Sequence, residues 1–255
     1  MLNVKYLPNK FTRLFSLAIV LNSVFLALAA PVNAQRRSQR TRVSDYGLPT
    51  HRRDGGSRGI KDSCVASAKA QNLMALIPEK SVGINVSKSP KLFFYVPEVD
   101  NQSTLEFVLR NEQDRLIYEA FLATEGNGIM SIEVPADVTA SLLESDQNYH
   151  WYLSMICNDQ QRSRDIVVEG WMRQETINSA TQKNLNNASL AEKAEVYRQE
   201  GFWFDALSVL AENPEALRKQ SRERQKWSEM LSSVGLRDLV SEPFIEAQLV
   251  DNPIK

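Results

Sequence analysis

Residues 104–110 read Thr-Leu-Glu-Phe-Val-Leu-Arg, and apolar side chains recur there at every second position. Leu105, Phe107 and Leu109 fall on one face of an extended chain, and mostly polar residues lie on the other. A period of two is the signature of a β-strand with one face toward a core. This segment therefore predicts a half-buried strand.

Patterns of the same kind recur between residues 73 and 173. Besides 104–110, strands are predicted at 91–97, 115–123, 129–135, 149–157 and 164–173, with weaker candidates at 73–77 and 82–87. Short turn-rich segments separate them, and no helical pattern intervenes. Eight strands at this spacing predict an antiparallel, immunoglobulin-like β-sandwich over residues 62–174.

The apolar spacing becomes helical after a polar stretch at 175–188, which is interpreted as a linker. Beyond Ser189, apolar residues recur every three or four positions, and Gly201 and Asn213-Pro214 mark helix ends and starts. Residues 189–240 are expected to form a helical cap, with a tail at 241–255. The predicted fold class is α+β, with the sandwich followed by a small C-terminal helical subdomain.

The beginning of the chain has the pattern of a secretory signal peptide at residues 1–34. A sparse positive region precedes an apolar run, which ends in small residues before the predicted cleavage between Ala34 and Gln35. Retention of the run as a membrane anchor is the alternative. If the signal is cleaved, we expect an exported protein of the periplasm or extracellular space that is not an integral membrane protein.

A basic leader is predicted at residues 35–61. It holds eight basic and two acidic side chains, a net charge of +6, whereas residues 62–255 carry −10. With few apolar residues it is expected to be disordered. It could bind an anionic surface or be only a solvated spacer. Nucleic acid is excluded as a partner because the chain is exported and the arginines lack interleaved aromatic residues.

The chain has two cysteines, Cys64 and Cys157, and both follow the signal peptide. An oxidising compartment favours a disulfide between them. The bond would close a loop of more than about 90 residues and stabilise the fold by roughly 4 to 5 kcal/mol. Two buried free thiols, or one reactive thiol, are the alternatives.

The histidines give little sign of catalysis. His51 lies in the predicted leader, and His150 is expected to face solvent because it alternates with Trp151 on its strand. A serine or cysteine hydrolase needs a base beside its nucleophile, and zinc needs neighbouring ligands. We therefore predict no catalytic residues, no metal and no cofactor.

Carboxylates are numerous, and a glycosidase needs only two of them across a cleft. The pairs considered lie at strand ends and are Glu98 with Asp100, Glu133, and Glu144 with Asp146. We interpret them as ordinary surface acids. Calcium at Asp100 is not expected because no EF-hand loop is present.

Phe202, Trp203 and Phe204 form an aromatic trio at a predicted helix turn. Exposed rings of this kind can bind a partner, so the trio is a candidate partner patch. The alternative is that the rings pack the helices onto a neighbouring element.

Several motifs together resemble a known family. They are Leu76-Ile77-Pro78, residues 93–97, Trp151 with Cys157, Gly170-Trp171, residues 201–206, and Trp227 followed by Val234-Gly235-Leu236. They are similar to an exported cyanobacterial family, domain of unknown function 928, over roughly residues 64–240. The resemblance implies a cyanobacterial source, where the exported space can also be the thylakoid lumen, and it supplies no catalytic residues. Tyr197, Gly201, Trp203 and Ala206 are also similar to the turn of a tetratricopeptide helix pair.

The predicted function is that of an exported, non-enzymatic binding or scaffolding module of the cell envelope, whose partner is another envelope or exported protein. One alternative is an accessory component of an envelope sensing or secretion system. The alternative from another class is a carboxylate-dependent glycan hydrolase.

Overall fold

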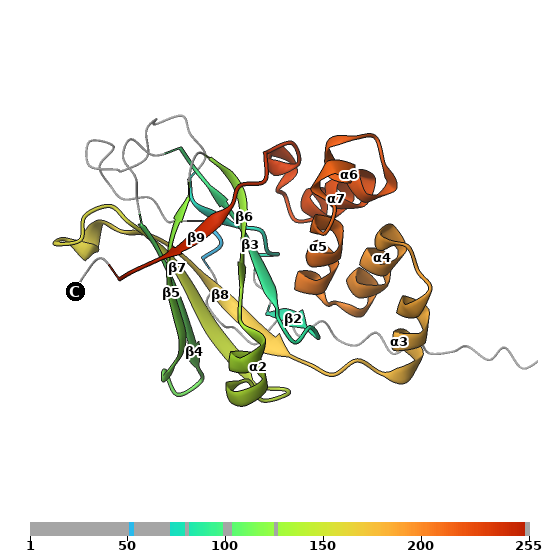
Figure 1. The fold of residues 1–255 in the computed structure, drawn as a ribbon, viewed down its shortest axis with the longest axis horizontal. Helices are drawn as coiled ribbons and strands as arrows, with labels where there is room; N and C mark the ends of the chain where they lie inside the picture. Colours follow the sequence, from blue (N-terminus) through green and yellow to red (C-terminus); the bar gives the residue numbers. More distant parts are fainter. Residues whose placement is uncertain (1–50, 54–71, 80–81, 99–103, 125–126, 253–255) are drawn as a thin grey trace, which may run out of the picture. The chain divides into compact units, whose positions relative to one another are not determined.

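The computed structural model describes residues 51–53, 72–79, 82–98, 104–124 and 127–252 (Figure 1). All of them belong to one compact unit that spans residues 42–255. The signal peptide, its cleavage site, most of the basic leader and Cys64 lie outside the described residues, so the predictions about them stay predictions.

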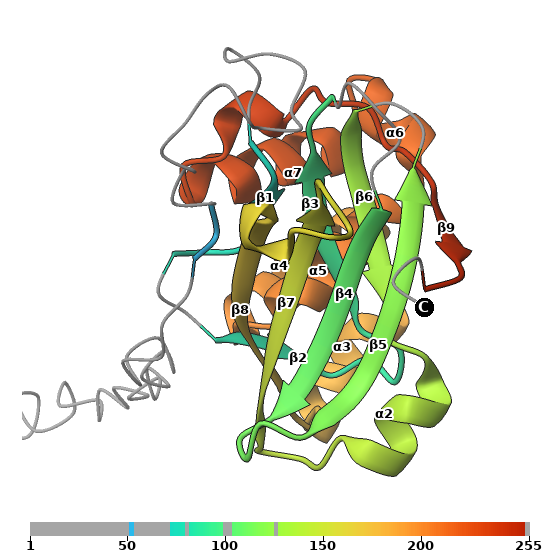
Figure 2. The same cartoon turned by 90° about the vertical axis from the view of Figure 1, so that its left-hand side faces the viewer.

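The strands form two sheets, which Figure 2 shows with the larger one in front. The larger sheet has the strand order β2-β8-β7-β4-β5-β9, and the smaller has the order β1-β3-β6. The strands are β1 (Met74–Ala75), β2 (Gly83–Asn85), β3 (Lys91–Val96), β4 (Thr104–Asn111), β5 (Leu116–Thr124), β6 (Gly128–Glu133), β7 (Asn148–Ile156), β8 (Ile166–Gln174) and β9 (Ala247–Val250).

Most helices follow the strands. They are α2 (Ala136–Leu142), α3 (Ser179–Asn186), α4 (Leu190–Glu200), α5 (Trp203–Ala211), α6 (Pro214–Arg218) and α7 (Arg222–Ser233), with 3-10 turns η3 (Arg162–Arg164) and η4 (Arg237–Leu239). Their boundaries follow local sequence signals. Ser189 and Glu192 form a capping box at the start of α4, and Gly201 ends that helix at a φ of +88°. Asn213 caps α6, with Pro214 in its first turn.

The first core lies between the two sheets. Leu105, Phe107 and Leu109 of β4 are buried there, as their spacing predicts. Phe94 of β3 meets them from the smaller sheet, with its ring centroid 5.5 Å from that of Trp151 in an edge-on contact. The alternating pattern of β4 therefore reflects a sheet with one face in this core.

The second core lies on the other face of the smaller sheet, where the C-terminal helices pack (Figure 1). Phe93 of β3 faces Trp227 of α7, with ring centroids 6.2 Å apart. Because the smaller sheet is covered on both faces, Leu92 to Val96 are all buried. Large sheet, small sheet and helices thus form three layers.

The predicted strands are confirmed, the two weak candidates included, and so is the mixed α+β composition. Two sheets with a shared core make the β-region sandwich-like. The prediction of antiparallel pairing throughout is wrong for β2, because Gly83–Asn85 runs parallel to Met172–Gln174 of β8. The immunoglobulin-like class stays a prediction.

Three predicted boundaries need correction. The linker at 175–188 contains α3, which Asn178 caps by accepting a hydrogen bond from the Thr181 N–H. The tail at 241–255 contains β9, which pairs with β5. Residues 51–53, assigned to the disordered leader, pair with strands. Each segment is short, and its order depends on tertiary contacts, which periodicity does not detect.

Asp205 connects α5 to the residues that follow β2 of the larger sheet. Its carboxylate accepts hydrogen bonds from the backbone N–H groups of Val86 and Ser87, both at 2.9 Å. The residue is 5% exposed. Burial raises the pKa of Asp205 to about 6, although the two N–H donors oppose that shift.

Asp205 is expected to make stability depend on pH. Since the pKa of Asp205 is raised in the folded state, the contribution of this side chain to stability is fully present below about pH 4. The contribution is lost as pH rises through about 6. A shift of the pKa from 3.8 to about 6 corresponds to a change of about 3 kcal/mol in the free energy of unfolding. Urea denaturation of wild type and Asp205→Asn between pH 4 and pH 7 measures the effect. As pH rises from 4 to 7, the free energy of unfolding of wild type minus that of the variant should fall by most of that amount, whereas a constant difference would contradict the assignment.

Candidate functional site

Residues 51–53 bridge the edges of the two sheets. His51 exchanges backbone hydrogen bonds with Glu169 of β8, at 3.2 and 3.1 Å, on the edge of the larger sheet. Arg52 O accepts a hydrogen bond from the Ala75 N–H of β1 at 3.0 Å, and Arg53 forms a bridge with Met74. We call this three-residue segment the N-terminal seam. Its side chains enter three different environments.

The Arg52 side chain is buried and joins the segment after β1 to the end of α7. One guanidinium nitrogen, Nη1, donates to the carbonyl oxygens of Ile77, at 3.0 Å, and of Val234, at 2.6 Å. The other, Nη2, pairs with Glu79 at 2.7 Å. Burial lowers the pKa of Arg52, and Glu79 partly offsets this. Arg52 therefore ties the seam to the end of α7.

His51 and His150, the two histidines of the chain, meet at one carboxylate. His51 Nδ1 lies 2.5 Å from Oε1 of Glu169, and His150 Nε2 lies 3.1 Å from Oε2. The second contact lacks the alignment of a hydrogen bond, so it is electrostatic. Separate oxygens of Glu169 thus face separate histidines.

The prediction that His150 faces solvent is wrong. It does lie on the opposite sheet face from Trp151, but its side chain is only 13% exposed. It stacks on Trp171 with ring centroids 4.2 Å apart, and its Nδ1 lies 2.7 Å from the Tyr152 hydroxyl oxygen. Burial lowers the pKa of His150, and the nearby negative charge of Glu169 partly offsets this effect.

The histidine cluster connects the N-terminal seam to the larger sheet. A general base must reach a substrate, whereas the two ring nitrogens of His150 face Tyr152 and Glu169. Within the described ranges, no three histidine, cysteine or acidic side chains are placed to share a metal ion. The cluster links His51 to β7 and β8.

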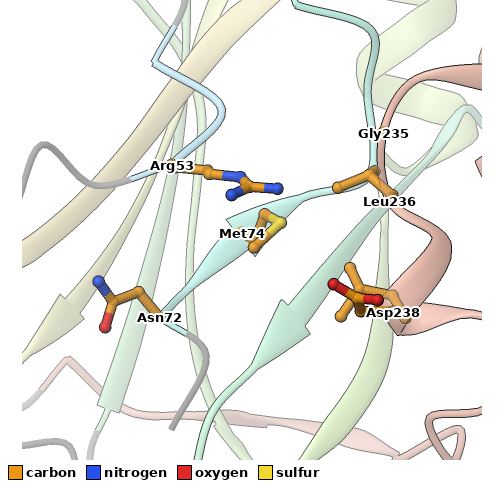
Figure 3. Close-up of a pocket in the computed structure, with 7 residues that line it drawn as sticks. Arg53, Asn72, Met74, Gly235, Leu236 and Asp238 are labelled. Atoms are coloured by element: carbon orange, nitrogen blue, oxygen red, sulfur yellow. The ribbon is translucent and has the colours of Figure 1, made fainter. Parts of the chain in front are cut away.

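A pocket of about 210 Å³ opens beside the N-terminal seam (Figure 3). Met74, Leu236 and Leu239 contribute buried apolar groups to it. Arg53, Asn72 and Asp238 are exposed polar residues around them, and Gly235 completes the lining. In Figure 3 the Arg53 guanidinium extends toward the pocket near Met74, with Asn72 and Asp238 on different sides.

Among the described residues, the side chains on the polar rim of the pocket have no partners within the fold. In the part of the chain that the structure describes, the side chains of Arg53, Asn72 and Asp238 form no hydrogen bond or ion pair. They are therefore available to a ligand. Sequence reasoning missed them because Arg53 comes from the predicted leader, Asn72 from the segment before β1 and Asp238 from the 3-10 turn η4, and only the fold brings them together.

The aromatic trio does not form an exposed patch, contrary to the partner hypothesis. Phe202 and Phe204 are 2% and 1% exposed. Trp203 is half-buried and donates its indole N–H to the Leu76 carbonyl oxygen at 2.7 Å. The rings instead pack the helices onto neighbouring elements, which is the alternative given in the sequence analysis. Phe204 sits directly over β2, where a Cβ on Gly83 would lie 2.1 Å from its ring.

Two of the candidate acids, Glu133 and Glu144, have side-chain partners, whereas Glu98 is exposed just after β3 and its side chain forms no hydrogen bond or ion pair within the described residues. Glu133 pairs with Lys91 across β3 and β6 at 3.2 Å, and Glu144 accepts a weak hydrogen bond from Gln147 at 3.4 Å. Asp146 lies in a turn with a φ of +64°. Asp100 is outside the described residues.

Cys157 follows the last residue of β7 and is half-buried. Its predicted partner, Cys64, is outside the described residues, so the disulfide stays a prediction. None of the helices in the described ranges has the length and apolar character needed to cross a membrane.

Comparison with known proteins gives one family. No curated protein matches the chain. The family model described as Domain of Unknown Function (DUF928) matches residues 53–244, which begin in the N-terminal seam and include both sheets up to β8 and the helices. The chain therefore belongs to the DUF928 family.

Proposed function

We propose that the protein is an exported, non-enzymatic binding or scaffolding module of the cell envelope that holds a partner protein at the pocket beside Arg53. The observation that carries this proposal is the makeup of the pocket. It combines an apolar floor with the unpaired side chains of Arg53, Asn72 and Asp238. Such a combination of apolar contact and orienting polar groups is typical of binding sites.

The volume favours a side chain of a protein partner over a free cofactor. Small-molecule and cofactor sites usually enclose about 300 to 1,000 Å³, and this pocket encloses about 210 Å³. That volume matches roughly seven water molecules. A single large aliphatic side chain fits it, as in the anchor of a protein interface. Arg53 and Asp238 would select a partner with an acidic and a basic group beside that anchor.

The remaining titratable groups support a non-enzymatic role. His51, His150 and Glu169 are engaged with one another in holding the N-terminal seam. Asp205 and Arg52 bind backbone groups inside the fold. These side chains stabilise the module that presents the pocket.

Several finer features complete the proposal. Export through the signal peptide places the mature chain in the periplasm, outside the cell or in a thylakoid lumen of a cyanobacterium, where Cys64 and Cys157 form a disulfide. The β-region is immunoglobulin-like, and α4 with α5 is a tetratricopeptide-like pair. The basic leader adds attraction to an anionic surface. A role as an accessory component of a sensing or secretion system fits the same module.

Charge reversal at the rim is expected to abolish capture of the partner. The mature chain, residues 35–255, is used to recover partners from an envelope extract, and the recovered proteins are quantified by mass spectrometry. Arg53→Glu and Asp238→Lys should each reduce recovery at least about tenfold, because each places a repulsive charge beside the partner's complementary group. Arg237→Glu and Asp251→Lys are matched controls on exposed side chains outside the pocket.

Equal recovery by pocket and control variants would contradict the pocket as the binding site. The glycan-hydrolase alternative is tested on the same preparation with purified envelope glycan. Turnover that a single substitution at Glu98, Glu133 or Glu144 removes would overturn the non-enzymatic proposal.

A further inference from the structure

Residues 243–250 bridge the two sheets on the side where β5 and β6 have open edges. The Ile129 N–H of β6 donates to the Pro243 carbonyl oxygen at 2.7 Å, and the Ile245 N–H donates back to Ile129 at 2.9 Å. Beyond that point, β9 pairs with β5 from Thr124 to Phe121. We call residues 243–250 the C-terminal seam. One extended segment thus satisfies backbone groups of both sheets.

The groove for this seam is shaped to the segment that fills it. Gly128, at a φ of +152°, lies so close that a Cβ there would be 2.3 Å from the Pro243 carbonyl oxygen and 3.1 Å from Ile245. Phe244 contacts Trp227, with ring centroids 5.4 Å apart. Ile245 and Ala247 pack on the core between the sheets. These contacts specify backbone position and side-chain size together.

The outer part of the same seam is weakly held. In β9, Leu249 is 73% exposed and Val250 is 40% exposed. Leu249 pairs with Leu122, a core residue of β5, so its side chain lies on the core side of the sheet and is still left uncovered. A four-residue edge strand with so little burial opens at low cost in free energy. Detachment would expose the β5 edge and an apolar strip.

We propose that the groove between β5 and β6 also accepts residues 243–250 of a second copy of this chain, so that two copies exchange their C-terminal seams. The second copy is the favoured occupant because its segment reproduces the close approach at Gly128 and the contacts of Phe244 and Ile245. Exchange replaces each internal contact by an identical contact between copies. The exposed Ser241 and Pro243 lie at the hinge between η4 and the seam.

A labelled peptide tests whether the groove is open to a segment from another molecule. The probe is a fluorescein-labelled peptide of residues 241–252, and fluorescence anisotropy reports its binding to the complete mature chain. Saturable binding is expected. Phe244→Ala in the chain weakens its own seam but leaves the groove intact, so the variant should bind the wild-type peptide about tenfold more tightly.

Two controls separate the groove from non-specific adhesion. A peptide carrying Ile245→Asp should not bind, because the charge would enter the core between the sheets. A chain carrying both Phe244→Ala and Gly128→Ala should bind the peptide at least about tenfold more weakly than the Phe244→Ala chain, because its own seam is already weakened and the added Cβ blocks the close approach of the peptide.

Dimer formation tests the exchange directly. Light scattering after size-exclusion chromatography should detect a concentration-dependent dimer of the mature chain, and excess 241–252 peptide should convert it to monomer. Monomer at every concentration would overturn the proposed exchange. So would an absence of peptide binding to both wild type and Phe244→Ala.

Discussion

Replacement of Phe94 by alanine is expected to lower the free energy of unfolding by about 3 to 5 kcal/mol. Phe94 is 0% exposed and lies between Phe107 and Trp151, with ring centroids 6.5 and 5.5 Å away. Removal of the ring leaves a cavity between two sheets that cannot close without moving their strands. Urea denaturation followed by tryptophan fluorescence measures the change.

The neighbouring residue provides the matched control for this prediction. Phe93 has the same side chain and comparable burial but faces Trp227 in the helical layer. Phe93→Ala should increase hydrogen exchange in α7 more than in β4 and β7, whereas Phe94→Ala should do the reverse. Identical exchange profiles for the two variants would contradict the three-layer arrangement.

The contrast between β3 and β4 shows what periodicity can predict. Residues 104–110 alternate because β4 meets the core on one face, and the predicted strand begins at the observed residue and ends one residue short of Asn111. In Lys91–Val96 the alternation is lost because one face meets the large sheet and the other meets helices more than 100 residues away. The sequence therefore predicted the strand but not the third layer.

The candidate site was much less predictable than the fold. His51 and His150 meet only because residues 51–53 pair with β8, and Glu169 carried no distinguishing pattern. The pocket likewise needs residues from both ends of the described chain, Arg53 and Asp238. Local signals such as caps and alternation act over a few positions, whereas these contacts depend on which sheet edges are left open.

The composition of the predicted leader, residues 35–61, does not indicate that Arg52 is buried. Residues 35–61 average to a polar, basic segment, and that average disfavours a hydrophobic core. Arg52 is nevertheless 5% exposed, because its two terminal guanidinium nitrogens donate to Ile77, Val234 and Glu79 where strands and helices meet. The burial of a particular arginine cannot be identified from the average composition of such a segment.

Arg52→Ala is expected to destabilise the protein by about 4 kcal/mol. The substitution leaves the carbonyl oxygens of Ile77 and Val234 without their donor, at a cost of roughly 2 kcal/mol each. Loss of the pair with Glu79 adds little because that carboxylate is 65% exposed. Arg52→Lys should recover only part of the loss, since an ammonium lacks the planar fork of the guanidinium.

Arg53→Ala is the adjacent control, because this side chain is exposed and forms no bond within the described residues. It should change the free energy of unfolding by less than about 0.5 kcal/mol in the same urea titration. Arg52→Ala should also increase hydrogen exchange at Ala75 and at the end of α7, because Arg52 joins β1 to that helix. If Arg52→Ala is as stable as Arg53→Ala, the N-terminal seam does not couple the sheets to the helices, and the pocket beside it would have no fixed geometry to present to a partner.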